Sequence, residues 1–161
     1  MFKLSYGLFV LTARQDGKDN GCIINTAGQL TDDPLRIQIS VNKANLTHDM
    51  ILATGEFNVS VLSQDAVFWV FQHYGFQSGR DTDKFADFKH TRRSGNGLLY
   101  LDKYVNAYIS CKVINQIDLQ THVMFICDVV QCMNLSKVET MSYTYYLNNV
   151  KPKPETDKKG Y

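Results

Sequence analysis

The chain has 161 residues, of which 44% are apolar and 12% aromatic, and its formal net charge is +1. This composition is typical of one folded domain with a sizeable core and excludes a largely disordered chain. The nearly balanced charge argues against a nucleic-acid-binding surface, and no apolar run is long enough for a membrane-spanning helix. We therefore expect a cytoplasmic protein whose partner is a small molecule or a specific protein, with no nucleic acid and no membrane.

The first third of the chain is dominated by strand signals. GLFVLTAR and GCIINT lie on either side of QDGKDNG, whose Asp16-Gly17 and Asn20-Gly21 steps are both strong turn signals. In the following PLRIQISVN, apolar and polar residues alternate, which predicts a strand with one buried face.

Two short helices are expected in the middle of the chain. Thr47 is a candidate N-cap for a helix that runs through Ala53 and ends at Gly55. After a further strand in EFNVSVLS, Ser63 is a candidate N-cap for QDAVFWVFQHY, which ends at Gly75 and carries an apolar stripe.

The second half again favours strands. Residues 105–116 and 121–133 are long strand candidates, and the short QIDLQ link between them predicts an antiparallel hairpin. MSYTYYL is a candidate for a last strand, and KPKPETDKKG has the composition of a solvated linker. Many short strands with two isolated helices predict a closed or nearly closed antiparallel barrel.

The cysteines show neither a Cys-x-x-Cys pair nor a zinc-like spacing to histidine, so no metal site is expected. Buried free thiols in a reducing compartment are the favoured interpretation. The four positions are Cys22, Cys111, Cys127 and Cys132.

No nucleophile, Walker or dinucleotide-fingerprint motif is present, which favours chemistry supplied by an organic cofactor. Three polar segments are candidates for a binding site: NTAGQLT, SVNKANLTHD and FQSGRDTDKF. The second combines a helix start, whose amides lack intrahelical acceptors, with a lysine and several amide and hydroxyl side chains. Such a set of donors suits a phosphate group.

Each candidate also has a simpler interpretation. Asn and Thr between a strand and a helix are ordinary capping residues, and taken alone this interpretation is favoured for SVNKANLTHD. Arg80, flanked by Asp81 and Asp83, has the pattern of a surface ion pair, and His122 that of a structural histidine. From the residues alone we predict an antiparallel β-barrel with a site for a phosphate-bearing ligand.

In their order along the chain, LSYGLFVLTA, DNGCIINTAGQLTDDPLRIQISVNKANLTHDMI, FNVSVL, GFQSGRDTDKF, NGLLYL and THVMFICDVV resemble the flavin reductase-like proteins. The similarity is to the branch of flavoredoxins and of the flavodomains of high-molecular-weight rubredoxins. It covers residues 1–147. It implies a mostly β fold, an antiparallel Greek-key split β-barrel with a few short helices, which binds FMN near the interface of a homodimer.

The resemblance also implies roles for individual residues. The N-T-x-x-Q-x-T segment is expected along the isoalloxazine and ribityl chain, which gives Asn25, Thr26 and Gln29, with Cys22 as an apolar neighbour. The ribityl-phosphate end is expected at Asn42, Lys43, Asn45, Thr47 and His48, and Ser40 is a further cofactor-binding candidate. Ser78, Arg80 and Lys84 are expected to line the same site. His122 is the candidate that faces the flavin or nicotinamide, and Cys127 departs from the family because many relatives have glycine there.

Three functions follow as alternatives. The first is an NAD(P)H-dependent flavin oxidoreductase with bound FMN, using NADH or NADPH as substrate. The second is an electron-transfer flavoprotein module that exchanges electrons with a rubredoxin-type iron protein, and the third is a ligand-binding barrel with no redox role. FMN and FAD are not distinguished by the sequence alone. We expect residues 1–149 to form the flavin-binding domain and residues 150–161, which end in Gly160-Tyr161, to be a linker that leads to a further domain.

Overall fold

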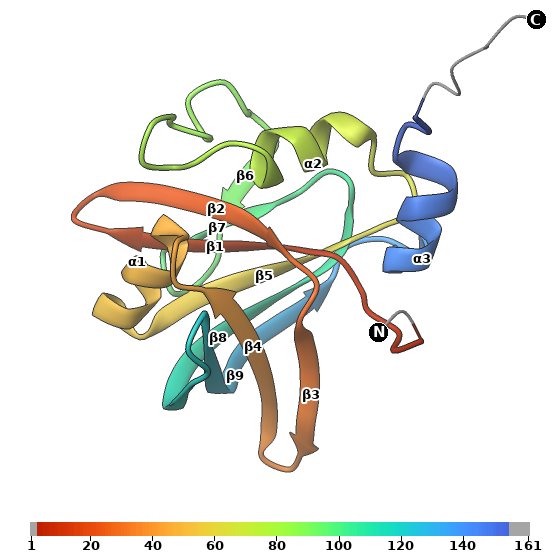
Figure 1. Cartoon of the computed structure of the whole chain (residues 1–161). Helices are drawn as coiled ribbons and strands as arrows, with labels where there is room; N and C mark the ends of the chain where they lie inside the picture. Colours follow the sequence, from red (N-terminus) through yellow and green to blue (C-terminus); the bar gives the residue numbers. More distant parts are fainter. Residues whose placement is uncertain (1–2, 155–161) are drawn as a thin grey trace, which may run out of the picture.

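The computed structural model describes residues 3–154, and its main feature is a seven-stranded antiparallel sheet (Figure 1). The strands of this sheet are β1 (Phe9–Gln15), β2 (Lys18–Ile24), β3 (Ala27–Asp32), β4 (Leu35–Asn42), β5 (Glu56–Leu62), β8 (Val105–Asp118) and β9 (His122–Asn134). Their spatial order is β2-β1-β5-β8-β9-β4-β3. A two-stranded sheet of β6 (Thr91–Arg93) and β7 (Leu99–Leu101) packs beside it, where the Thr12 hydroxyl donates to the Leu99 carbonyl at 2.5 Å.

The large sheet curls around one of two buried clusters. Cys22 and Ile24 from β2, at one edge, belong to the same buried cluster as Ile37 and Ile39 from β4, near the other edge. Within residues 3–154, however, β2 and β3 form no ladder with each other, so the barrel is split along this line. The predicted mostly β, antiparallel architecture is confirmed.

The β1–β2 hairpin closes at only one of its two turn signals. Asp16 and Gly17 have φ values of 50° and 80°, the left-handed pair that a two-residue hairpin turn requires. The second predicted turn is wrong, because Asn20 and Gly21 lie inside β2 and pair with Ala13 and Thr12. The buried carboxamide of Asn20 explains why an asparagine occurs within this strand.

Two further hairpins shape the barrel. The expected antiparallel pairing of the two long strands is confirmed by β8 and β9, which pair from Ala107 with Asn134 to Asp118 with Val123. The β3–β4 hairpin extends away from the rest of the molecule at the bottom of Figure 1.

Helix α1 (Leu46–Thr54) follows β4 directly. Asn45 occupies its N-cap position in an extended conformation, without a side-chain capping bond. The predicted cap at Thr47 is therefore wrong, because Thr47 is the second residue of the helix and is fully buried. Gly55 ends the helix as predicted, with φ of 72° and its N–H donated to the Ile51 carbonyl at 2.8 Å.

Helix α2 (Phe68–Gly75) is shorter than expected. Its N-cap position is Val67 rather than Ser63, whose hydroxyl bonds the Asp65 carboxylate instead. The buried side of α2 consists of Val70, Phe71 and Tyr74. These side chains join a second core cluster that includes Leu8 and Val10, on the other side of β1 from the barrel interior.

The predicted strand in MSYTYYL is wrong. Only Ser142 forms an isolated bridge, with Gly7, and the chain then turns into α3 (Tyr143–Tyr145) and the π-helical turn η1 (Tyr146–Val150). The ring of Tyr146 packs on Phe71 with 4.3 Å between centroids, which anchors this segment to α2. Residues 151–154 are exposed, and the rest of the predicted linker, with Gly160-Tyr161, lies outside the described residues.

The four thiols are free, as predicted, but not all are buried. Burial raises the pKa of the Cys111 thiol, and it raises the pKa of Cys127 to about 12. These two remain protonated and act as small apolar residues. Cys132 is exposed, which corrects the prediction for that position, because β9 runs beyond the covered part of the sheet there.

Candidate functional site

Two polar hollows adjoin at Asn45, beside the line along which the barrel is split. The α1 hollow, of about 280 Å³, is lined by Asn20, Cys22, Ala44, Asn45, Leu46, Thr47, Gly75, Phe76, Gln77, Ser78, Gly79 and Lys84. The β2–β3 hollow, of about 110 Å³, is lined by Ile23, Ile24, Asn25, Thr26, Ser40, Asn42, Asn45 and His122. The two hollows together therefore extend from the start of α1 to the crossing between β2 and β3.

Ten of the predicted site residues line these hollows. They are Cys22, Asn25, Thr26, Ser40, Asn42, Asn45, Thr47, Ser78, Lys84 and His122. Segments far apart in the sequence thus converge on one place, as a single binding site requires. Gln29, Lys43, His48 and Arg80 do not line either hollow.

Lys84 is the buried cation of the α1 hollow, with 3% of its surface exposed. Its ammonium group donates to the Gly21 carbonyl at 2.8 Å and to the Tyr74 carbonyl at 3.0 Å. Among the described residues, no carboxylate lies within ion-pair distance of it, and burial lowers its pKa. Two of the three donors of the ammonium group are thus used, which leaves one N–H available for an anion, and a bound anion would offset the cost that burial imposes on the charged form.

The start of α1 forms the opposite wall. The first amides of a helix have no intrahelical acceptor and attract anions through the helix dipole. Here these positions are Leu46 and Thr47, which line the hollow beside Asn45. The Thr47 hydroxyl accepts a hydrogen bond from the Asn20 carboxamide at 2.9 Å, so a neighbouring strand fixes its position.

Cys22 lies between these groups but has no nucleophilic character. Burial raises the pKa of its thiol, and the Thr47 hydroxyl and Lys84 offset only part of that effect. At neutral pH the side chain is a neutral, weakly polar surface of the hollow.

The β2–β3 hollow is lined by amides and hydroxyls rather than charges. Thr26 is tied to β4, because its hydroxyl donates to the Ser40 carbonyl at 2.7 Å and its own carbonyl accepts from the Ser40 N–H at 3.2 Å. The Asn42 carboxamide accepts from the Ala44 N–H at 2.9 Å, which shapes the turn into α1. Asn25 and His122 complete a wall able to bind polar edges of a heterocycle.

Lys43, Arg80 and His48 lie outside both hollows, and each contacts a carboxylate elsewhere. Lys43 pairs with Asp118 at 2.7 Å, and Arg80 pairs with Asp49 at 2.6 Å. His48 is buried, and its Nδ1 lies 2.9 Å from the same Asp49 carboxylate. For Arg80 the surface ion pair weighed in the sequence analysis is thus the observed arrangement.

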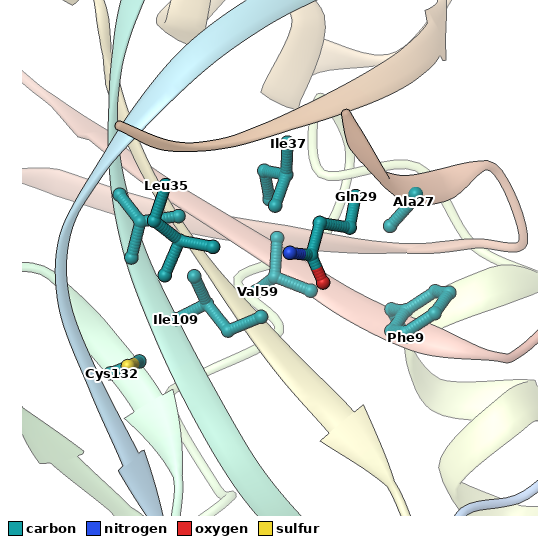
Figure 2. A pocket seen from close by; sticks show the side chains of 10 residues that line it. Phe9, Ala27, Gln29, Leu35, Ile37, Val59, Ile109 and Cys132 are labelled. Carbon is teal, nitrogen blue, oxygen red and sulfur yellow. The ribbon is translucent and has the colours of Figure 1, made fainter. Parts of the chain in front are cut away.

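Gln29 lies in a different cavity. Its side chain extends into an apolar hollow of about 270 Å³ beneath the β3–β4 hairpin, toward Val59 and Ile109 (Figure 2). Phe9, Ile37 and Cys132 lie around the same space. Gln29 is thus separated from Asn25 and Thr26 by the course of β3.

Several lining residues were not identified from the sequence. The Asn20-Gly21 step predicts a turn, which gives no indication of the buried carboxamide of Asn20. Phe76 and Gly79 lie in the candidate segment FQSGRDTDKF, but their side chains offer no polar group that would mark them as lining residues. No sequence signal marks Asn20 as a lining residue, because it follows Lys18 and Asp19 and precedes Gly21, a context typical of a turn.

Comparison with known proteins identifies the family. Residues 1–153 match the family model described as flavin reductase like domain. The chain belongs to the flavin reductase-like family. This confirms the resemblance noted in the sequence, and with it the split-barrel fold.

Two relatives and one solved structure illustrate the family. The chain is 39% identical over 143 residues to a high molecular weight rubredoxin of Moorella thermoacetica, and the match covers 89% of this chain and 62% of that protein. It is 31% identical over 145 residues to a ferric-chelate reductase (NAD(P)H) of Archaeoglobus fulgidus, and the match covers 90% of this chain and 85% of that protein. The FMN-binding protein from Thermus thermophilus with bound p-hydroxybenzaldehyde superposes with a TM-score of 0.75 at 20% identity, covering 83% of this chain and 74% of that one. At that identity the likeness concerns the fold.

No helix in the described part of this flavin reductase-like chain combines the length and apolar character needed to cross a membrane.

Proposed function

We propose that this chain binds FMN and acts as an NAD(P)H-dependent flavin oxidoreductase. The observation that carries the proposal is the buried Lys84 ammonium, which has no carboxylate partner among the described residues and faces the start of α1 across the α1 hollow. A buried charge is costly unless a counter-charge compensates it. The terminal phosphate of FMN supplies that counter-charge.

The remaining lining residues fit the rest of the cofactor. With the phosphate in the α1 hollow, Asn45, which lines both hollows, would hold the ribityl chain. There Asn25, Thr26 and Ser40 offer donors and acceptors to a ring edge. The name of the Thermus thermophilus neighbour supports FMN as the flavin, and a terminal phosphate fits the α1 hollow more simply than the diphosphate of FAD.

The chemistry places few demands on the chain itself. When bound, FMN would supply the capacity to take hydride from a nicotinamide dinucleotide and to pass electrons on. The residues of the chain would bind and orient the flavin, and His122, which lines the β2–β3 hollow, is the candidate to contact the ring or the nicotinamide. The NAD(P)H named in the Archaeoglobus relative supports this class of reductant.

A second function is an electron-transfer module that exchanges electrons with a rubredoxin-type iron protein. It is favoured by the Moorella relative, a high molecular weight rubredoxin of which this chain spans 62%. In that case residues 1–149 are the flavin-binding domain and residues 150–161 lead to an iron-binding partner. The exposure of residues 151–154 is consistent with a linker that starts there.

We further propose that the active form is a homodimer. Seven of the exposed large apolar side chains lie on the neighbouring strands β3, β4, β8 and β9 or the turn between the last two: Leu30, Leu35, Ile114, Ile117, Leu119, Val130 and Met133. Leu35 also lines the apolar cavity that holds Gln29, and exposed apolar side chains gathered on adjacent strands are of the kind that protein partners cover. Gln29 is assigned to this interface rather than to the two polar hollows.

The test is a titration of the purified chain with FMN, FAD and riboflavin, followed by anaerobic addition of NADH or NADPH. We expect binding of FMN far tighter than that of riboflavin, and loss of the flavin absorption bands on addition of a nicotinamide dinucleotide. Equal affinity for FMN and riboflavin would contradict the role of the phosphate. A flavin that stays oxidised with both dinucleotides, but is reduced rapidly by a reduced rubredoxin, would select the second function.

A further inference from the structure

Asn20 contacts two walls of the α1 hollow at once. Its Nδ2 donates to the Thr47 hydroxyl at 2.9 Å, at the start of α1. On its other side the carboxamide lies against Gly79, where an added Cβ would come within 2.0 Å of Asn20 Oδ1. Asn20 and Gly79 are both buried, and all three residues line the hollow.

The choice of asparagine is informative because the position disfavours it. Asparagine is depleted in strands, and a buried carboxamide costs free energy unless it is hydrogen-bonded. Asn20 nevertheless lies in β2, opposite Ala13, with 2% of its surface exposed. The hydrogen bond to the Thr47 hydroxyl compensates this cost, and the same bond is the contact between Asn20 and α1.

Gly79 is needed for close approach rather than for backbone conformation. Its φ lies outside the left-handed region, which leaves the space taken by the Asn20 carboxamide as the reason for the missing side chain. The loop is held there a second time, because the Lys18 ammonium donates to the Gly79 carbonyl at 2.9 Å. The loop therefore rests on β2 at a separation that the Asn20 side chain defines.

We propose that Asn20 is a positioning residue of the flavin site: it fixes the width of the α1 hollow between the start of α1 and the Gly79 loop. This inference rests on the proposed function, since the terminal phosphate of FMN is the group held between these walls. Riboflavin lacks that phosphate, so the width of the hollow affects its binding little.

The first test compares Asn20→Ala with Asn58→Ala. Asn58 is a fully buried asparagine in β5 whose carboxamide donates to the Leu98 and Leu99 carbonyls, and it lines neither hollow. Asn20→Ala is expected to weaken the binding of FMN about tenfold and that of riboflavin less than about twofold. The reason is that one well-placed hydrogen bond and the geometry that it maintains are lost. Asn58→Ala is expected to lower the melting temperature while leaving the ratio of FMN to riboflavin affinity unchanged. An Asn20→Ala protein that keeps the wild-type ratio would overturn the proposal.

The second test uses Gly79→Ala, which adds a methyl group at the carboxamide. In the wild-type background we expect a loss of FMN affinity of about tenfold, because the loop must move away from β2. In the Asn20→Ala background the methyl group has room, and the added loss is expected to be less than about threefold. Equal losses in both backgrounds would contradict a shared contact that sets the width.

These outcomes are distinguishable from failure of the proposed function. If the wild-type chain binds FMN no better than riboflavin, the phosphate assignment itself fails and the positioning role falls with it. If the wild-type chain prefers FMN strongly and the Asn20 and Gly79 variants keep that preference, only the positioning role is rejected.

Discussion

At the scale of single residues, the two lysines predicted for the flavin site differ in their surroundings. Lys84 is buried, donates to two backbone carbonyls and faces the α1 hollow. Lys43 is directed to the surface, where both of its contacts to the Asp118 carboxylate are shorter than 3 Å. A buried cation contributes more to anion binding than an exposed one, because water screens it less.

This difference predicts unequal effects of the same substitution. Lys84→Met should weaken FMN roughly ten- to a hundredfold, the range of one charge-assisted hydrogen bond, while riboflavin binding changes little. Lys43→Met, the matched control, should change FMN affinity less than about threefold. Fluorescence titration with both flavins measures these ratios, and thermal melting verifies that each variant folds. A larger loss at Lys43 than at Lys84 would refute the assignment.

Residue identity was more predictable from the sequence than side-chain direction. Asn25, Thr26 and Thr47 were identified as site residues and line the hollows. Lys43 and Arg80 belong to the same motifs, but they form ion pairs with Asp118 and Asp49 instead of lining the hollows. These carboxylates are distant in the sequence, so the motifs do not predict the ion pairs. A motif specifies which residues come to a region, whereas the nearest opposite charge decides where a long side chain points.

At the scale of elements, strands were predicted better than helix starts. The alternation in β4 and the long β8–β9 pair follow from a period of two, which is a property of the strand itself. Whether a Ser or Thr hydroxyl caps a helix depends on which other groups form hydrogen bonds with it. Thr47 is held by Asn20 and Ser63 by Asp65, so neither caps a helix. The alternating tyrosines of MSYTYYL likewise form a helix, because packing against Phe71 outweighs the strand pattern.

The Asp49–Arg80 pair joins α1 to the loop that follows α2. The Arg80 guanidinium, and then His48, hold the pKa of the Asp49 carboxyl below its ordinary value. A depressed folded-state pKa contributes stability above the unfolded-state value of about 3.9, and this contribution is lost as the pH falls through the folded-state pKa. The two side chains are 47% and 44% exposed, so the contribution is small.

Arg80→Gln should therefore lower the free energy of unfolding by less than about 1 kcal/mol at neutral pH, and high salt should reduce the difference. As the pH falls through the folded-state pKa of Asp49, the stabilities of the variant and the wild type should converge, because Asp49 becomes protonated in both. Urea unfolding at a series of pH values measures this. A difference that persists unchanged in acid would show that Arg80 acts through packing rather than charge.

At the scale of the whole molecule, the apolar surface on β3, β4, β8 and β9 predicts how the chain associates. Val130 lies in β9 and is 56% exposed, and Leu52 in α1 is 51% exposed but lies outside that surface. Val130→Asp should convert a dimer into a monomer in sedimentation experiments, because a charge in an apolar interface is strongly unfavourable. Leu52→Asp should leave the dimer intact. A wild-type chain that sediments as a monomer at all concentrations would reject the dimer.

The line along which the barrel is split has a consequence for the chain without its ligand. β2 is hydrogen-bonded to a neighbouring strand only through β1, and β3 only through β4, so in the described chain both are edge strands. Exposed edge strands offer free N–H and C=O groups to other chains, which is a route to aggregation. The β2–β3 hollow is lined by residues at the end of β2 and in the link to β3. If flavin binds there as proposed, it should reduce aggregation through these edges, which is distinct from the ordered dimer proposed for the other strands.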